Sequence, residues 1–308
     1  MTLTMRKYES EEDYRRIREF LRRVFLVNGW KEYSWQAYRF DYWRRLGIEG
    51  LGHGSLETHV FLWETSDGEI GAVLNGEAPG NAWLQIDPAI RTPELEAEMI
   101  SVAEQHLTVP TGDNRSKVRV WAIEDDRLRE DILKQRGFVK SEAVGYERRR
   151  DMNEPIANGA VAEGYSIRSL GGAEELPARS WLSWRAFHPN APDSEYQGWE
   201  WYRALQKAPL YRRDLDLVAV APDGDLAAFT TIWFDDVTRT GAFEPVGTSP
   251  EHQRRGLASA VMCEGLRRLG RLGATMAYVG SWNEATHRLY GSLGFTDYVV
   301  NRGWVKEV

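Results

Sequence analysis

The chain has 308 residues, a net charge of −7 and one cysteine, Cys263. At roughly 100 to 200 residues per domain, this length predicts two domains. Both halves carry the negative charge and lack a long basic block, which argues against a broad surface for nucleic acid or an anionic membrane. One cysteine excludes an internal disulfide, and we find neither a signal-peptide pattern nor a run of 18 apolar residues. We therefore expect a cytoplasmic protein without a membrane span.

The first half predicts a mixed α/β unit, in the order β, two helices, three strands, then α, β, α, β. We expect helices over 8–25, 34–46, 92–107 and 126–138, and strands over 58–64, 68–76, 81–87, 116–124 and 144–150. The glycine-rich stretch 47–54 follows a helix instead of a strand and does not fit the dinucleotide-binding pattern, so we interpret it as a loop.

Residues 151–163 are polar, small and interrupted by Pro155 and Gly159, which predicts an interdomain linker between domains 1–150 and 164–308. The second half then repeats the order of elements. We expect strands over 165–170, 239–248, 275–280 and 297–304, a hairpin over 215–234, and helices over 174–187, 194–207, 256–270 and 283–295. The matching endings LKQRGFVKSE and LYGSLGFTDY support a duplicated fold.

The stretch EHQRRGLASAVM, residues 251–262, places two arginines and a glycine where a helix begins. A helix N-terminus has unpaired N–H groups and a partial positive charge, so it suits an anion. Gly256 removes a side chain, and Arg254 and Arg255 add forked donors that fit phosphate oxygens. Taken alone, the stretch also fits an ordinary strand-to-helix turn with solvated arginines.

Two segments in order carry a family resemblance. Gln253-Arg254-Arg255-Gly256-Leu257-Ala258 follows a predicted strand, and NEATHRLYGSLGF, residues 283–295, comes later. Together they resemble the GNAT superfamily of acyl-CoA-dependent N-acyltransferases. The resemblance covers residues 165–308, and it reaches 1–150 only through element order and the Gly137-Phe138 ending. It implies two tandem GNAT-like domains, each with a mixed α/β sheet.

The resemblance assigns the acyl-CoA contacts by position. The backbone of Val246, Gly247 and Thr248 would bind the pantetheine arm, and Asn283 would contact that arm or its adenine side. The pyrophosphate would lie against the turn and first helical residues, namely Gln253, Arg254, Arg255, Gly256, Leu257, Ala258 and Ser259. Acetyl-CoA is then a co-substrate.

Aminolysis of a thioester needs a neutral amine and a proton for the leaving thiolate. An alkylamine of pKa ~10.4 is about three orders of magnitude short of its neutral form at pH 7. Tyr290 matches the acid of the family and would protonate the sulfur. Glu244 is the candidate proton acceptor or amine anchor, because period-two alternation puts it on one face with Val246 and Thr248. The open alternatives are a core tyrosine and a solvated carboxylate.

Other polar residues have structural interpretations. Asp235 and Asp236 lie at a predicted hairpin tip, where they either attract a cationic acceptor or make the turn. His188 is a loop histidine or borders the acceptor pocket, and Cys263 has core spacing in a helix. The histidines and the cysteine lack metal-ligand spacing, so we expect no metal.

The first half lacks the residues that carry the GNAT resemblance in the second half. Aligning the two Gly-Phe endings places Leu133 at the position of Tyr290 and Asp126 at that of Asn283. Residues 86–99 carry no glycine before the helix and have acidic residues where phosphates would bind. We expect this half to be catalytically silent.

Three hypotheses follow. The first is an N-acetyltransferase that moves the acetyl group of acetyl-CoA directly to a primary amine in a ternary complex. The alternative is an acyl-CoA-binding or interaction protein without turnover, and the third is a scaffold that binds no CoA. The amine acceptor, the acyl-chain preference and the oligomeric state stay open, because fold does not fix function.

Overall fold

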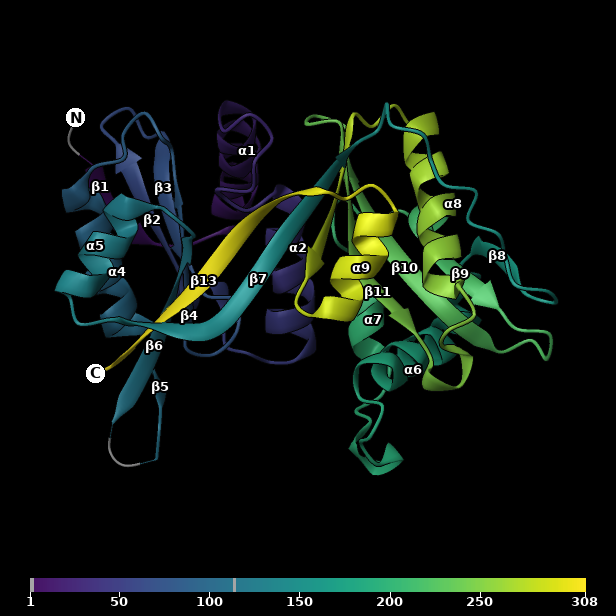
Figure 1. Ribbon diagram of the computed structural model, residues 1–308. Helices are drawn as coiled ribbons and strands as arrows, with labels where there is room; N and C mark the ends of the chain where they lie inside the picture. Colours follow the sequence, from purple (N-terminus) through teal and green to yellow (C-terminus); the bar gives the residue numbers. More distant parts are fainter. Residues whose placement is uncertain (1–2, 113–114) are drawn as a thin grey trace. The chain divides into compact units, whose positions relative to one another are not determined.

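The computed structural model describes residues 3–112 and 115–308. It divides into two compact units, each built from helices and strands (Figure 1). Unit 1 contains Met1–Tyr146 and Val299–Val308, and unit 2 contains Glu147–Tyr298. The predicted fold class, a mixed α/β fold, is confirmed.

Unit 1 is a mixed sheet with helices on both faces. Its sheet runs in the order β1-β2-β3-β4-β6-β13, and β5 pairs with β6. Its strands are β1 (Leu3–Lys7), β2 (Val60–Thr65), β3 (Ile70–Asn75), β4 (Asn81–Ile86), β5 (Val109–Pro110), β6 (Ser116–Ile123), the first part of β7 (Val139–Asp151) and most of β13 (Asp297–Glu307). Its helices are α1 (Glu11–Val27), α2 (Ala37–Tyr42), the π-helical η1 (Trp43–Gly50), α3 (Leu56–His59), α4 (Pro93–His106) and α5 (Arg127–Gln135).

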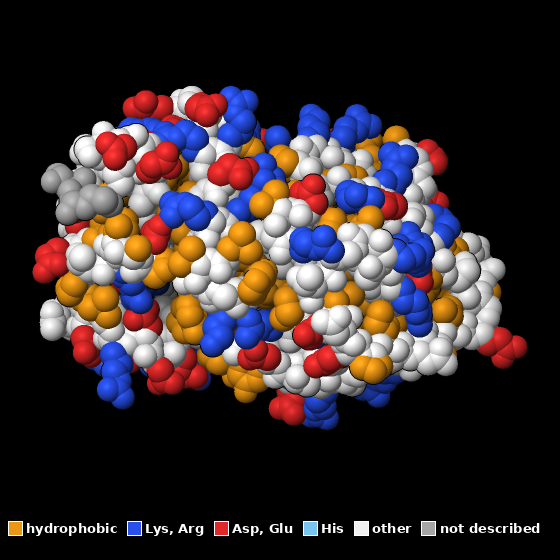
Figure 2. All heavy atoms as spheres, turned by 90° about the horizontal axis from the view of Figure 1, so that it is seen from above, with side chains coloured by type: hydrophobic (Ala, Val, Ile, Leu, Met, Phe, Trp, Pro, Cys, Tyr) orange, Lys and Arg blue, Asp and Glu red, His pale blue; other side chains and the backbone are white. Residues whose placement is uncertain are grey.

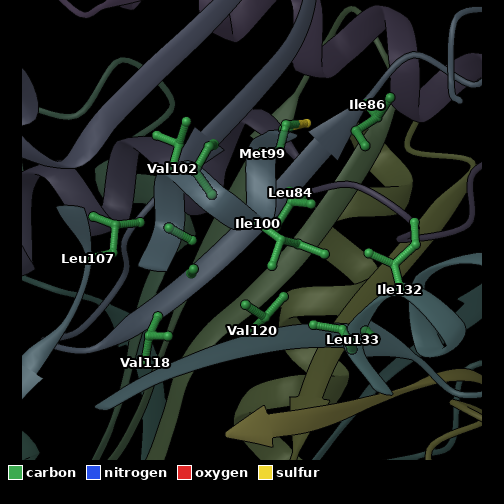
Figure 3. Close-up of a cluster of buried hydrophobic side chains, with 14 of the residues drawn as sticks. Leu84, Ile86, Met99, Ile100, Val102, Leu107, Val118, Val120, Ile132 and Leu133 are labelled. Carbon is green, nitrogen blue, oxygen red and sulfur yellow. The ribbon is translucent and has the colours of Figure 1, made fainter. Parts of the chain in front are cut away.

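Strand β2 shows how the two faces of this sheet are made. Phe61 and Trp63 belong to the core under α4 and α5, whereas Val60 and Leu62 belong to the core under α1. This is the period-two alternation of a strand buried on both faces. Figure 3 shows the first core, in which side chains of β4 and β6 pack against α4 and α5.

The predicted loop at 47–54 is partly wrong. Helix α2 ends at Tyr42, and η1 continues to Gly50, so the helical segment runs past the expected end at 46. A Cβ on Gly47 would lie 2.9 Å from Cδ1 of the buried Trp43. Gly47 therefore lets the chain pass close to this indole, and packing overrides the loop signal of the glycines.

Unit 2 repeats the arrangement. Its sheet runs in the order β12-β11-β10-β9-β8. Its strands are β8 (Ser166–Ser169), β9 (Asp216–Val220), β10 (Leu226–Asp235), β11 (Thr240–Thr248) and β12 (Met276–Ser281). Its α-helices are α6 (Leu176–Phe187), α7 (Glu200–Leu205), α8 (Leu257–Arg271) and α9 (Glu284–Ser292), and its 3-10 turns are η2 (Ala173–Glu175), η3 (Asp193–Glu195), η4 (Arg213–Leu215) and η5 (Pro250–His252). Helix α7 is shorter than the predicted 194–207, because Gly198 has a φ of 93° and interrupts the helix.

The core of unit 2 on one face of its sheet lies under α8 and α9. Ile232 and Phe243 of the central strands pack there against Leu266 of α8 and Tyr290 of α9. Helix α6 packs against β10 and β11. Cys263 is fully buried in the same core, and burial raises the pKa of its thiol. Its predicted packing role is confirmed.

The units differ from the predicted domains in two places. Residues 151–163 lie within unit 2, and the backbone of Gly159 approaches the side chain of Cys263, so this segment packs against α8. The last ten residues belong to unit 1, where β13 pairs with β6 from Asn301↔Ile123 to Glu307↔Lys117. Local composition carries no information about such pairing between distant segments.

Acidic and basic side chains are intermixed on the face shown in Figure 2. Across the described ranges, we find no helix with the length and apolar character of a membrane span. The same residues contain no cluster of three or more metal-ligating side chains.

Candidate functional site

The N-terminus of α8 has no side-chain cap among the described residues. Gly256 is its N-cap residue with a φ of 74°. The first-turn N–H groups of Leu257, Ala258 and Ser259 therefore point out of the helix without a side-chain acceptor. A Cβ on Gly256 would meet no atom within 4 Å. Glycine is needed here for its left-handed backbone, and the space beside it is open.

The two arginines of this turn extend into solvent. Arg254, Arg255 and Gln253 are exposed, and neither guanidinium forms an ion pair within the described ranges. Arg255 lies 6.0 Å from the ring centre of Tyr165. Arg254 has a φ of 60°, a conformation that costs a non-glycine residue on the order of 1 to 3 kcal/mol. Positive charge and strained backbone thus coincide at the uncapped helix end.

The loop before this turn is held by contacts that the sequence did not reveal. Glu251 accepts hydrogen bonds from Ser249 Oγ and from Arg185 Nη2, the latter at 3.3 Å. The hydroxyl of Tyr165 lies 2.9 Å from His252 Nδ1. Arg185 and Tyr165 come from α6 and from the segment before β8, so no local pattern could predict them. Arg185 and Tyr165 thus hold residues 251 and 252, which precede α8.

Strand β11 carries a bulge next to the predicted catalytic carboxylate. Val246 pairs with Thr230 and Phe243 pairs with Ile232, so two residues of β11 stand opposite one residue of β10. The extra residues are Glu244 and Pro245. A bulge bends its strand and breaks side-chain alternation. Simple alternation therefore does not by itself fix the face of Glu244 relative to Val246 and Thr248, and their alignment stays a prediction.

Strands β11 and β12 part near this bulge. Their parallel register runs from Thr240↔Met276 to Ala242↔Tyr278, and residues 243–248 lie beyond it. Val246, Gly247 and Thr248 are half-buried and pair with β10 on their other side. A Cβ on Gly247 would lie 2.5 Å from the ring of Phe229, so this position excludes a side chain. The register with β12 thus ends before residues 246–248, which keep β10 as their strand partner.

Tyr290 and Glu244 lie close enough to interact electrostatically. Tyr290 is 5% exposed on α9, and its ring centre is 6.4 Å from that of Phe295. Burial raises the pKa of the Tyr290 phenol well above its usual value, and the negative charge of Glu244 raises it further. The phenol therefore stays protonated at neutral pH. This electrostatic effect of Glu244 is the link that the structure shows between the two residues proposed for proton transfer.

Trp233 is a part of this site that the sequence analysis did not single out. Its indole Nε1 donates a 2.6 Å hydrogen bond to the carbonyl oxygen of Glu244, at the bulge. Trp233 is 1% exposed, and its ring lies edge-on to Tyr211. A tryptophan in an apolar strand predicts a core residue. Only the register of β10 against β11 reveals its hydrogen bond to the carbonyl oxygen of Glu244.

Asn283 is the N-cap of α9. Its Oδ1 accepts a 3.0 Å hydrogen bond from Thr286 N, and the Thr286 hydroxyl bonds back in a capping box. Its side-chain NH₂ has no partner within the described residues. The cofactor role predicted for Asn283 therefore depends on this amide nitrogen.

The other candidates have local roles. Asp235 is buried and accepts a 3.0 Å hydrogen bond from Val237 N, which makes the hairpin turn. His188 is exposed at the end of α6, and its Nδ1 lies 3.1 Å from the carbonyl oxygen of Trp184. A cavity of about 490 Å³ lies between α6, the β9–β10 turn and residues 249–252.

The equivalent helix of unit 1 has a closed N-terminus. Thr92 caps α4 by accepting a 3.2 Å hydrogen bond from Leu95 N, and Pro93 removes one N–H group. Leu133 is fully buried in the core. Asp126 caps α5 as Asn283 caps α9.

In comparison with known proteins, residues 176–295 match the model of the acetyltransferase (GNAT) family. A mycothiol acetyltransferase of Thermomonospora curvata is 31% identical over 193 residues, covering 61% of this chain and 63% of that protein. This chain thus spans less than two thirds of that relative. A mycothiol acetyltransferase of Thermobispora bispora is 27% identical over 241 residues, covering 75% of this chain and 77% of its own length.

Two solved structures share the fold over nearly the whole chain. A GCN5-related N-acetyltransferase from Sphaerobacter thermophilus matches with a TM-score of 0.68 and 16% identity, covering 99% of this chain and 95% of the other. A tandem GNAT protein from the clavulanic acid biosynthesis pathway matches with a TM-score of 0.67 and 14% identity, covering 99% and 98%. At such identity the likeness concerns the fold alone, and the fold is that of tandem GNAT proteins.

Proposed function

We propose that this chain transfers the acetyl group of acetyl-CoA directly to a primary amine, because residues 176–295 match the model of the GNAT acetyltransferase family. The proposal rests on one observation, which is that two features occur together in unit 2. An uncapped, arginine-flanked helix end and a buried, protonated phenol beside a carboxylate occur in the same unit. The first suits a diphosphate, and the second suits proton transfer.

In this proposal the chain holds acetyl-CoA mainly through its backbone. The N–H groups at the start of α8, with Arg254 and Arg255, bind the pyrophosphate. The half-buried stretch 246–248 of β11 pairs with the pantetheine arm, and the Asn283 amide lies along it. The uncapped N–H groups and the free guanidinium groups are the features of this structure that fit such a ligand.

The chemical step then needs two proton movements. The neutral amine attacks the thioester carbonyl carbon, and the C–S bond breaks as the amide forms. Tyr290 gives its phenolic proton to the leaving sulfur, and Glu244 accepts the proton lost by the amine nitrogen. Water returns both groups to their starting states. A positioned acid or base contributes about 10²- to 10⁴-fold, which is the scale of the shortage of neutral amine at pH 7.

The test is a turnover assay on the full chain. Acetyl-CoA is incubated with a panel of primary amines while the free thiol of CoA is followed. The panel includes the acceptor of mycothiol acetyltransferases, since the two curated relatives carry that name. We expect turnover with at least one amine. Binding of acetyl-CoA without turnover over the whole panel would instead support a non-catalytic binding protein, and absence of binding would support a scaffold.

A further inference from the structure

Unit 1 contains a cavity of about 490 Å³ where two parallel strands part. The register of β4 against β6 covers Asn81↔Arg119 and Ala82↔Val120, and the cavity begins beyond it, at Leu84, Ile86 and Ile123. Ligands of α/β proteins bind at the carboxyl ends of such diverging strands. The volume lies within the roughly 300 to 1,000 Å³ of small-molecule sites.

The arginines that line this cavity are already neutralised. Glu96, which is fully buried, accepts hydrogen bonds from Arg129 Nε at 2.8 Å and from Arg91 Nε. Arg91 Nη2 also lies 2.6 Å from a carboxylate oxygen of Asp126. Burial alone raises the pKa of Glu96, but the two guanidinium groups lower it below its usual value, so it stays charged. The cavity therefore has no free cation for an anionic ligand among its described lining residues.

The N-terminus of α4, which directly follows the lining residue Arg91, is also unsuited to a diphosphate. The cap by Thr92, the proline at 93 and the acidic first turn with Glu94 and Glu96 close the N-terminus of α4. The corresponding end of α8 in unit 2 has none of these features. A ligand of this cavity must be recognised by other groups.

Four lining residues have polar side-chain groups without a hydrogen bond or ion pair to the described residues, namely Asn28, Tyr33, Ser34 and Asp125, and only the last is charged. Ser34 is 5% exposed, and its hydroxyl makes no hydrogen bond within the described ranges. Asp125 is exposed, and its carboxylate is in no ion pair with any described residue. Leu84, Ile86 and Ile123 supply apolar surface beside them. The lining thus offers the negative charge of Asp125, the buried hydroxyl of Ser34, the neutral polar groups of Asn28 and Tyr33, and an apolar wall.

We propose that this cavity binds a small organic molecule carrying a primary ammonium group on an apolar body. The ammonium pairs with Asp125 and donates to the Ser34 hydroxyl, and the body packs on Leu84 and Ile86. Unit 1 would thereby be a second ligand site, with a chemistry opposite to that of the α8 turn. This inference does not depend on acetyl transfer by unit 2.

Calorimetric titration of the full chain tests the proposal. The probes are tyramine and tyrosol, which share size and ring and differ in the ammonium group. Phenethylamine and tryptamine complete the amine set. We expect tyramine to bind at least about fivefold more tightly than tyrosol, and we expect Asp125→Asn to abolish this preference. Asp225→Asn is the matched control, because Asp225 is also exposed and lines the cavity of unit 2. It should leave the preference intact.

Ser34→Ala should weaken amine binding severalfold while the thermal unfolding of the chain stays unchanged. Four results would overturn the inference, and three of them concern the amine probes. They are no saturable binding of any of the three amines, equal affinity for tyramine and tyrosol, and an unchanged preference in Asp125→Asn. A fourth is a stoichiometry of two CoA molecules per chain that falls to one in Ile86→Trp, because the cavity would then accept a diphosphate.

Discussion

Tyr290 combines deep burial with a polar group that burial alone would penalise. Its phenol is in an apolar core, and its pKa is raised by desolvation and by the charge of Glu244. A group held protonated in this way can donate a proton and is a poor base. In the proposed reaction Tyr290 is therefore the acid, and Glu244 is left as the acceptor.

Tyr290→Phe should lower kcat by about a hundredfold or more, with little change in the affinity for acetyl-CoA. Phenylalanine keeps the ring packing and removes only the hydroxyl. Because the folded pKa of the phenol is raised, its ionisation should not produce a fall in wild-type rate up to pH 10. Tyr298→Phe, at an exposed ring, is the control for loss of a phenol. Equal kcat in wild type and Tyr290→Phe would refute the assignment.

Trp233 is proposed as a positioning residue, since its indole N–H holds the backbone carbonyl of Glu244 at the bulge. Trp233→Phe leaves the ring and removes the N–H donor. We expect kcat to fall about tenfold, and we expect the pH dependence of kcat/KM to shift because the Glu244 carboxylate is no longer fixed. The loss of stability should be about 1 to 3 kcal/mol, as for an unpaired buried acceptor.

The control is Trp63→Phe in unit 1, where a fully buried indole donates a 3.0 Å hydrogen bond to Glu98. It should cost comparable stability in a denaturant titration and leave kcat and the pH profile unchanged. If both variants lowered kcat alike, the role of Trp233 would be structural only.

Among the elements, the contrast between α8 and α4 is the most informative. Both helices follow a central strand that parts from its neighbour, yet α8 begins with a left-handed glycine and α4 with a capping threonine and a proline. The helix dipole favours an anion at both N-termini. In α4 the Thr92 side chain accepts a hydrogen bond from a first-turn N–H group. In α8 no side chain does so, and we propose that a bound anion takes this place.

Arg254→Gln and Arg255→Gln should each raise the KM for acetyl-CoA roughly tenfold, with kcat nearly unchanged, since a charge-assisted hydrogen bond contributes about 1.5 to 3 kcal/mol. Added salt should weaken binding to the wild type more than to the variants. Arg271→Gln at the other end of α8 is the control, because its side chain is 68% exposed and its contact with Glu264 is 3.4 Å long. An equal effect of Arg271→Gln would argue against a local site.

At the scale of the whole molecule, residues 299–308 form a strand of the sheet in unit 1. Residues 299–308 belong to unit 1, and the buried Trp304 of β13 packs in the core shared by α4 and α5. Unit 1 therefore cannot be complete before the last residues are present. A division into consecutive domains misses this dependence.

Removing residues 299–308 should destabilise unit 1 selectively, because β6 loses a partner and the core loses Trp304. Hydrogen exchange should rise across β6 and remain slow in the buried part of α8. Trp304→Ala, expected to cost about 3 to 5 kcal/mol, gives the same pattern with the strand retained. Faster exchange confined to unit 2 would contradict this account.

The sequence by itself determined the local features of this protein. Alternation and helical spacing gave nearly all the elements, and residues 253–259 with Tyr290 gave the candidate site, because these signals depend on neighbouring residues. Only the tertiary structure decided the bulge at Glu244, the anchor Trp233, the extension of the helix at 43–50 and the placement of 299–308. Each of these depends on register or packing between segments far apart in the chain, which pattern alone does not encode.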